Sequence, residues 1–76
     1  MRTTNEYLDY VFTIEQLDDG TYDVDFPDIP EIITGGKTMD EAYHNAREAL
    51  ELHLDSLREM GRPLPKKTRK LAVINA

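Results

Sequence analysis

Four aspartates in the first half of the 76-residue chain are the residues best suited to chemistry. Asp9, Asp23, Asp25 and Asp28 lie on or near two segments with the alternation typical of β-strands. Two-metal hydrolysis of phosphodiesters needs carboxylates that converge from several elements on ions about 4 Å apart. Asp23 and Asp25 share one face of a strand, but the segment expected to form the last strand offers Asn75 and no acid. The pattern favours an acidic surface that is solvated or binds a partner, and a residual metal-dependent nuclease is the weaker alternative.

The stretch from Gly35 to Thr38 reads Gly-Gly-Lys-Thr and resembles the end of a phosphate-binding loop. A complete loop of this type has a glycine five residues before its last glycine, and Glu31 occupies that position here. An acid at this point would repel a phosphate group. The stretch therefore predicts a glycine corner followed by a helix cap, and no nucleotide cofactor.

Other catalytic and metal-binding patterns do not occur in the sequence. His44 and His53 are nine residues apart, a spacing that does not bring them together on a helix as metal ligands. The chain has no cysteine, and no serine or lysine has an evident activating partner. The sequence therefore predicts a protein that is not an enzyme, with no catalytic residue, no metal site and no cofactor.

The elements that would position the aspartates begin with a hairpin. Apolar and polar residues alternate over residues 8–15 and again over 22–26, and each alternation predicts a strand with one buried face. Residues 18–20, reading Asp-Asp-Gly, supply the turn because they tolerate positive φ. Pro27 ends the second strand, and the two isoleucines at 32–33 predict a short third strand before the glycine corner.

A long helix is predicted from about Thr38 to about Met60. Thr38 and Glu41 have the spacing of a capping box, in which each side chain bonds the other's free amide. Gly61 suits the residue just beyond a helix end, and Pro63 cannot continue the helix. A polar tail follows, and residues 71–74 predict a final strand.

The predicted helix carries leucines on two faces. The stripe expected to be buried consists of Ala42, Ala46, Ala49, His53, Leu57 and Met60. Leu52 and Leu54 lie off this stripe. A helix of about 22 residues is about 33 Å long, whereas a six-residue strand is about 20 Å long. Leu52 and Leu54 on an overhanging helix therefore predict a homo-oligomer interface, dimer or tetramer, and scattered surface leucines are the alternative.

These elements predict an α+β fold of order β-β-β-α-β, with an antiparallel sheet packed against one long helix. We expect a single domain over residues 1–76, with its core at about 7–75 and no separate DNA-binding domain. The basic tail at residues 66–70 lacks interleaved aromatics, so it predicts a solvated linker and not a nucleic-acid-binding arm.

Charge is distributed unevenly along the chain, whose net charge is −6. Residues 1–37 carry nine acids against two basic residues, whereas residues 61–76 carry five basic residues and no acid. The N-terminal half should repel nucleic acid and attract basic surfaces. The sequence has no apolar signal-peptide core and no run long enough to span a membrane, so we expect a cytoplasmic protein.

The order of these motifs resembles the HicB antitoxin family over about residues 8–65. The family pattern has an aromatic first strand, a Gly-x-Tyr second strand that ends in Phe-Pro-Asp-x-Pro, a Thr-x-Gly-x-Thr corner and an acidic-Glu-Ala helix start. The matching segments here are residues 10–14, 20–22, 26–30, 34–38 and 40–42.

The resemblance implies a partial ribonuclease-H-like fold without nuclease activity. It also implies an antitoxin that neutralises a small basic HicA-type toxin, an mRNA-cleaving protein, by docking on it. The residues expected to bind the toxin are Asp9, Asp23, Asp25 and Asp28. Many relatives add a helix-turn-helix or ribbon-helix-helix segment, and this sequence shows none, so we expect no direct DNA binding. A structural homo-oligomer without a toxin partner is the alternative.

Overall fold

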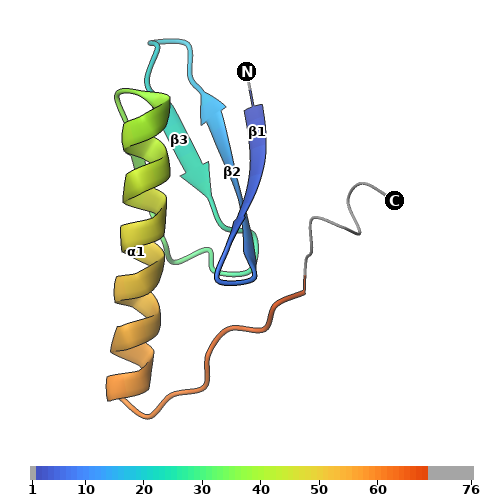
Figure 1. The fold of residues 1–76 in the computed structure, drawn as a ribbon, viewed down its shortest axis with the longest axis vertical. Coiled ribbons are helices and arrows are strands. Elements are labelled where there is room, and N and C mark those ends of the chain that lie inside the picture. Colours follow the sequence, from blue (N-terminus) through green and yellow to red (C-terminus); the bar gives the residue numbers. More distant parts are fainter. Residues whose placement is uncertain (1, 69–76) are drawn as a thin grey trace.

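The computed structural model describes residues 2–68, which form a four-stranded antiparallel sheet and one helix (Figure 1). The elements are β1 (Arg2–Tyr7), β2 (Tyr10–Gln16), β3 (Tyr22–Asp25), β4 (Thr34–Gly36) and α1 (Met39–Glu59). The strands lie in the sheet in their order along the chain, and each pairs with the next. Helix α1 runs along the sheet in Figure 1, so the predicted α+β class is confirmed.

Strand β1 is an element that the sequence did not predict. It pairs with β2 along its whole length, from Arg2 opposite Glu15 to Tyr7 opposite Tyr10. Leu8 and Asp9 make the turn between them with φ values of 50° and 69°, the positive pair that a two-residue type I′ turn needs. The predicted first strand therefore begins at Tyr10 and not at residue 8. Only Tyr7 in β1 is a large apolar residue, so the strand lacks the alternation that would reveal it.

Strand β4 begins at Thr34, two residues later than the strand predicted at residues 32–33. Ile32 is buried in the core and Ile33 is 92% exposed, and neither belongs to a strand. The glycines expected to form a corner are instead paired with β3. A Cβ atom at Gly36 would lie 2.6 Å from the backbone nitrogen of Ala42. Glycine therefore lets β4 pass close against the first turn of α1.

The predicted helix limits are confirmed to within one residue. Thr38 is the N-cap, and its hydroxyl accepts a hydrogen bond from the Glu41 amide at 3.1 Å. The Glu41 carboxylate accepts in return from the Lys37 amide at 2.9 Å, one residue before the expected partner. Gly61 has a φ of 67° and follows the C-cap Met60, which ends the helix as the sequence indicates.

The buried stripe of α1 differs from the predicted one in its second half. The buried helix residues are Ala42, Ala46, Leu50 and Leu54, which repeat at every fourth position. Leu54 is only 2% exposed, so its assignment to an oligomer interface is wrong for the described chain. The predicted stripe continued from Ala46 to Ala49, whereas the observed one continues to Leu50. One residue corresponds to about 100° of rotation around a helix, so the two stripes face different directions after Ala46. Leu52 is 65% exposed, as expected.

The core lies between α1 and the sheet face that carries Tyr10, Phe12 and Ile14. Phe12 stacks on Phe26, with ring centroids 5.0 Å apart, and Val24, Ile29 and Ile32 close the same cluster. The predicted strand at 71–74 lies outside the described residues. Within residues 2–68, no helix combines the length and apolar character that crossing a membrane requires.

Candidate protein-binding surface

The outer face of the sheet, opposite α1, is acidic near β3. Residues paired across an antiparallel sheet point to the same face, and Glu15 pairs with Asp23 while Thr13 pairs with Asp25. Val24 lies between the two aspartates and points to the core. Asp23 and Asp25 are both exposed, as is Glu15. We call Glu15, Asp23 and Asp25 the β3 acidic face, and the sequence predicted its two aspartates to lie together.

Asp9 and Asp28 occupy a different part of the surface, where the chain returns after α1. The Asp9 carboxylate lies 3.7 Å from the Lys67 ammonium. The Asp28 carboxylate accepts a hydrogen bond from the Thr68 amide at 2.9 Å and another from the Thr68 hydroxyl. The four predicted aspartates therefore form two separate pairs, and the second pair already holds part of the chain itself.

Three residues of the segment 65–68 contact the rest of the chain: Pro65, Lys67 and Thr68. The Tyr10 hydroxyl donates to the carbonyl of Pro65 at 2.5 Å. The Lys67 ammonium lies 5.2 Å from the centre of the Tyr10 ring, a cation–π distance. Burial, and then the nearby Asp28 carboxylate, raise the pKa of the Tyr10 hydroxyl, which stays protonated as a donor. Residues 66–68 are exposed, as expected of a solvated tail, but these contacts hold them against the rest of the chain.

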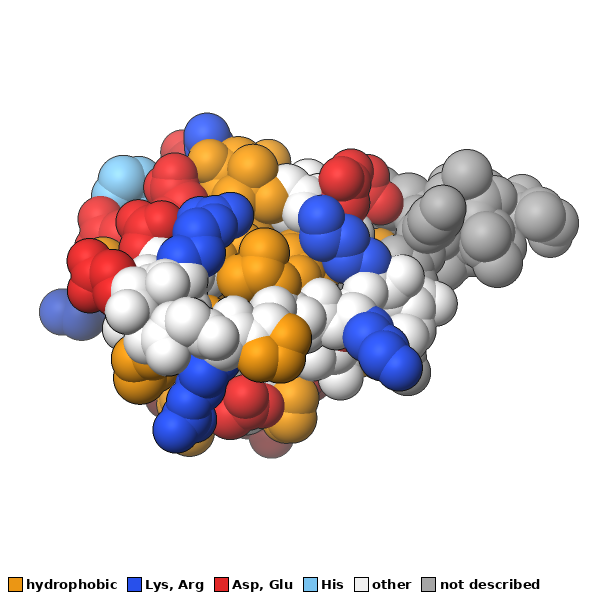
Figure 2. Space-filling model, turned by 90° about the horizontal axis from the view of Figure 1, so that it is seen from below, with side chains coloured by type: hydrophobic (Ala, Val, Ile, Leu, Met, Phe, Trp, Pro, Cys, Tyr) orange, Lys and Arg blue, Asp and Glu red, His pale blue; other side chains and the backbone are white. Residues whose placement is uncertain are grey.

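Figure 2 views the molecule from this end, where α1 finishes. Lysine and arginine side chains surround a group of hydrophobic ones in the middle of the view. Acidic side chains are also visible in this view, and two of the basic residues in or after the last turn of α1 pair with acids, Lys67 with Asp9 and Arg58 with Asp55.

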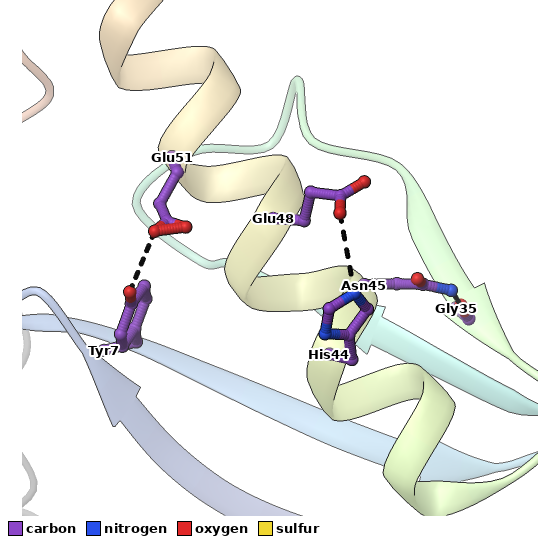
Figure 3. Close-up of polar contacts among 6 residues, drawn as sticks. All are labelled: Tyr7, Gly35, His44, Asn45, Glu48 and Glu51. Carbon is purple, nitrogen blue, oxygen red and sulfur yellow. Dashed lines mark hydrogen bonds and ion pairs between the residues drawn. The ribbon is translucent and has the colours of Figure 1, made fainter.

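Polar side chains on α1 attach the helix to both outer strands of the sheet (Figure 3). The Tyr7 hydroxyl of β1 donates to the Glu51 carboxylate at 3.0 Å, and the Arg47 guanidinium lies 4.5 Å from the Tyr7 ring centre. On the other side, the Asn45 amide donates to the Gly35 carbonyl of β4 at 2.8 Å. The Tyr7 contacts were missed because they depend on β1, which the sequence did not predict, and the Asn45 contact because Gly35 was expected in a corner and not in a strand. They hold the scaffold and form no reactive arrangement.

The two histidines do not form a metal site. His44 lies 3.5 Å from Glu48 on the exposed side of α1, and His53 lies 3.9 Å from Glu31. Among residues 2–68, no group of three or more His, Cys, Asp or Glu side chains is arranged to hold a metal ion. Within the described chain, the arrangement thus offers charge and shape for binding a protein.

Comparison with known proteins identifies the family. A sequence profile of the HicB-like antitoxins of bacterial toxin–antitoxin systems matches residues 10–76. The crystal structure of the N-terminal domain of Burkholderia pseudomallei antitoxin HicB superposes with a TM-score of 0.74 at 28% identity, and the match covers 100% of this chain and 81% of that one.

Sequence relatives include proteins of very different lengths. An uncharacterised 14.9 kDa protein of Haemophilus phage HP1 is 40% identical over 57 residues, which are 75% of this chain and 42% of the phage protein. A UPF0150 protein of Thermoplasma acidophilum is 30% identical over 69 residues, which are 91% of this chain and 100% of that protein.

Antitoxin HicB 1 of Photorhabdus laumondii is 49% identical over 41 residues, which are 54% of this chain and 26% of the antitoxin. The chain thus spans less than half of the phage protein and about a quarter of this antitoxin. The profile match, the Photorhabdus relative and the Burkholderia structure agree with the sheet and helix described above, and the chain belongs to the HicB-like antitoxin family, whose members are regulatory proteins and not enzymes.

Proposed function

We propose that the chain neutralises a small basic HicA-type mRNA-cleaving toxin in the cytoplasm by docking on it directly. Family membership supports a toxin partner in general. The observation that points to a basic partner is the β3 acidic face, where Glu15, Asp23 and Asp25 are exposed side by side.

The β3 acidic face mainly affects the rate at which the chain and a basic partner associate. Exposed acids of one sign attract a basic protein over a distance of about 10 Å at moderate salt, which raises the association rate and orients the partner. A toxin covered on its basic, RNA-binding side cannot bind mRNA, so docking alone inhibits it without any chemistry by this chain.

Asp9 and Asp28 contribute in a second step. Their carboxylates already contact Lys67 and Thr68, so a toxin lysine or arginine that binds them competes with the segment 65–68. We therefore expect charge reversal at Asp23 and Asp25 to affect the association rate first, and changes at Asp9 and Asp28 to affect the lifetime of the complex.

The test uses the protein encoded in the reading frame adjacent to the gene for this chain. Co-purification and surface plasmon resonance at 50 and 300 mM salt compare the wild type with a variant carrying Asp23→Lys and Asp25→Lys. We expect association at low salt to slow at least tenfold in that variant and to lose most of its salt dependence. Asp18→Lys with Asp40→Lys is the control, because it changes the net charge equally at exposed acids outside the β3 acidic face.

Absence of a small basic binding partner would remove the proposal, and so would an association rate that ignores both lysines. Self-association through Leu52 is the second candidate, because this leucine is 65% exposed on α1. Light scattering tests it directly, and a monomer at micromolar concentration excludes it.

A further inference from the structure

A groove lies between α1 and the segment that enters β4. It has a volume of about 370 Å³, and its wall is formed by Glu31, Ile32 and Ile33 on one side and by Ala49, Leu52, His53 and Ser56 on the other. We call it the Ile33 groove. It borders the core at Ile32, whereas the groove residues of α1 lie off the buried stripe of that helix.

Two features show that the Ile33 groove is incomplete in the isolated chain. Ile33 is 92% exposed and Leu52 is 65% exposed, so two large aliphatic side chains of one groove face water. The Nε2 atom of His53 is buried and has no hydrogen-bond partner among residues 2–68, since its nearest carboxylate, that of Glu31, is 3.9 Å away. Buried polar atoms are normally hydrogen-bonded, so the 3.9 Å separation from Glu31 leaves this pairing unclosed among the described residues.

The residues that flank the Ile33 groove are mostly acidic, and this charge bears on which kind of partner could cover the groove. Glu48 and Asp55 lie four residues before and three residues after Leu52, and Glu59 lies three residues after Ser56, so all three flank the groove on one side of α1. All three are exposed, as is Glu31 within the groove. Among the described residues, two basic side chains contact the three flanking acids: the Arg58 guanidinium bonds Asp55 at 3.0 Å, and the His44 ring lies 3.5 Å from Glu48.

A second copy of this chain would bring an identical set of carboxylates against this rim, which like-charge repulsion disfavours. A basic partner would be attracted by the same set. The charge pattern therefore favours a basic partner over a second copy of this chain as the occupant of the groove.

We infer that the Ile33 groove receives an aliphatic or aromatic side chain carried on a basic segment of the toxin, with lysine or arginine side chains of that segment against Glu31 and the acids of α1. This inference rests on the proposed function, because it names where the same partner is anchored. The groove lies beside the edge strand β4, since Ile33 directly precedes β4, and β4 pairs with the strand that carries Asp23 and Asp25. One partner thus covers both surfaces around the β4 edge.

The test replaces the two exposed aliphatic residues with neutral polar ones, so that no charge is added. The variant with Ile33→Asn and Leu52→Gln is compared with Leu17→Gln, a control at a leucine that is 44% exposed in the β2–β3 turn. Calorimetry measures the affinity of each for the toxin encoded beside the gene. We expect the groove variant to bind at least tenfold more weakly, the loss typical of removing a central apolar anchor, and the control to bind as the wild type does.

A matching change of charge tests the rim. Glu48→Lys with Glu59→Lys should slow association and weaken its salt dependence, whereas thermal unfolding of all variants should stay near that of the wild type because the altered side chains are exposed.

The outcomes are distinguishable. Toxin binding that is unaffected by Ile33→Asn and Leu52→Gln overturns this inference and leaves the proposed function standing. A wild-type chain that binds no toxin overturns the proposed function and this inference with it. A free chain that is dimeric by light scattering and becomes monomeric on the same two substitutions shows that a second copy fills the groove, which also overturns the inference.

Discussion

The close approach of β4 to α1 predicts that Gly36→Ala destabilises the fold. The added Cβ would lie 2.6 Å from the Ala42 nitrogen and 3.0 Å from both the Ala42 Cα and the Glu41 carbonyl carbon. Non-bonded carbon atoms pack at about 3.5–4.0 Å. All three neighbours are backbone, so no side chain can rotate away, and the strand and helix must separate by several tenths of an ångström. The hydrogen bond from Asn45 to the Gly35 carbonyl, 2.8 Å long, resists that separation.

The expected decrease in the free energy of unfolding of Gly36→Ala is the difference between two opposing effects. Overpacking of this kind costs about 1–3 kcal/mol. Gly36 does not have a positive φ, so alanine also restricts the unfolded chain and returns about 0.4–1 kcal/mol. At their midpoints the two terms leave a net destabilisation of about 1.3 kcal/mol, which lowers the melting temperature of a domain this small by about 5–10 °C.

Urea and thermal unfolding followed by circular dichroism measure this change. Gly20→Ala is the comparison variant with the opposite cause of destabilisation, because Gly20 has a φ of 90° and a Cβ there would meet no atom within 4 Å. The stability of the Gly20→Ala variant therefore measures the effect of backbone strain in the absence of a steric clash. A Gly36→Ala protein that melts at or above the wild-type temperature would contradict the reasoning about the strand–helix contact.

Three further predictions concern the core, the tail and pH. Leu50→Ala, at a residue with 0% exposure, should cost about 2–5 kcal/mol in urea unfolding, and a loss below 1 kcal/mol would show that the core is not packed around it. Tyr10→Phe removes the hydroxyl that donates to Pro65, so amides after Pro65 should exchange hydrogen faster while unfolding changes by no more than about 1.5 kcal/mol; unchanged exchange would refute the contact. Hydrogen bonds from Thr21 lower the pKa of Asp19 below 3.8 in the folded state, so its contribution is present above the unfolded pKa and is lost as pH falls through the folded one. The stability difference between the wild type and Asp19→Asn should therefore shrink from pH 7 to pH 2, and an unchanged difference would show that Asp19 does not contribute.

Local signals in the sequence were sufficient for α1. Thr38, Glu41 and Gly61 act within one or two turns of the chain, and the helix begins and ends where they indicate. Which side of the helix is buried depends on the sheet beneath it. The alanines at the start fit two rotations equally well, and contact with the sheet selects the one that buries Leu54.

Contacts between distant segments account for most of what the sequence did not reveal. Asp23 and Asp25 share a face because a strand alternates, and this was predictable. The binding of Thr68 by Asp28 joins residues 40 positions apart, and nothing near either residue indicates it. The Ile33 groove is similar, because Ile33 alternates with buried Ile32 like a strand residue but lies at the end of a loop that runs past α1.

The sequential order of the sheet has a consequence for folding. Each strand pairs with its neighbour in the chain, and the longest loop between paired strands is the eight residues 26–33. Closing such short loops costs little chain entropy and favours fast folding. A ribosome delivers residues 2–36, which contain the whole described sheet, before any of α1. The segment 65–68 contacts Tyr10 and Asp28, which are synthesised long before it, so we expect it to dock after the sheet has formed.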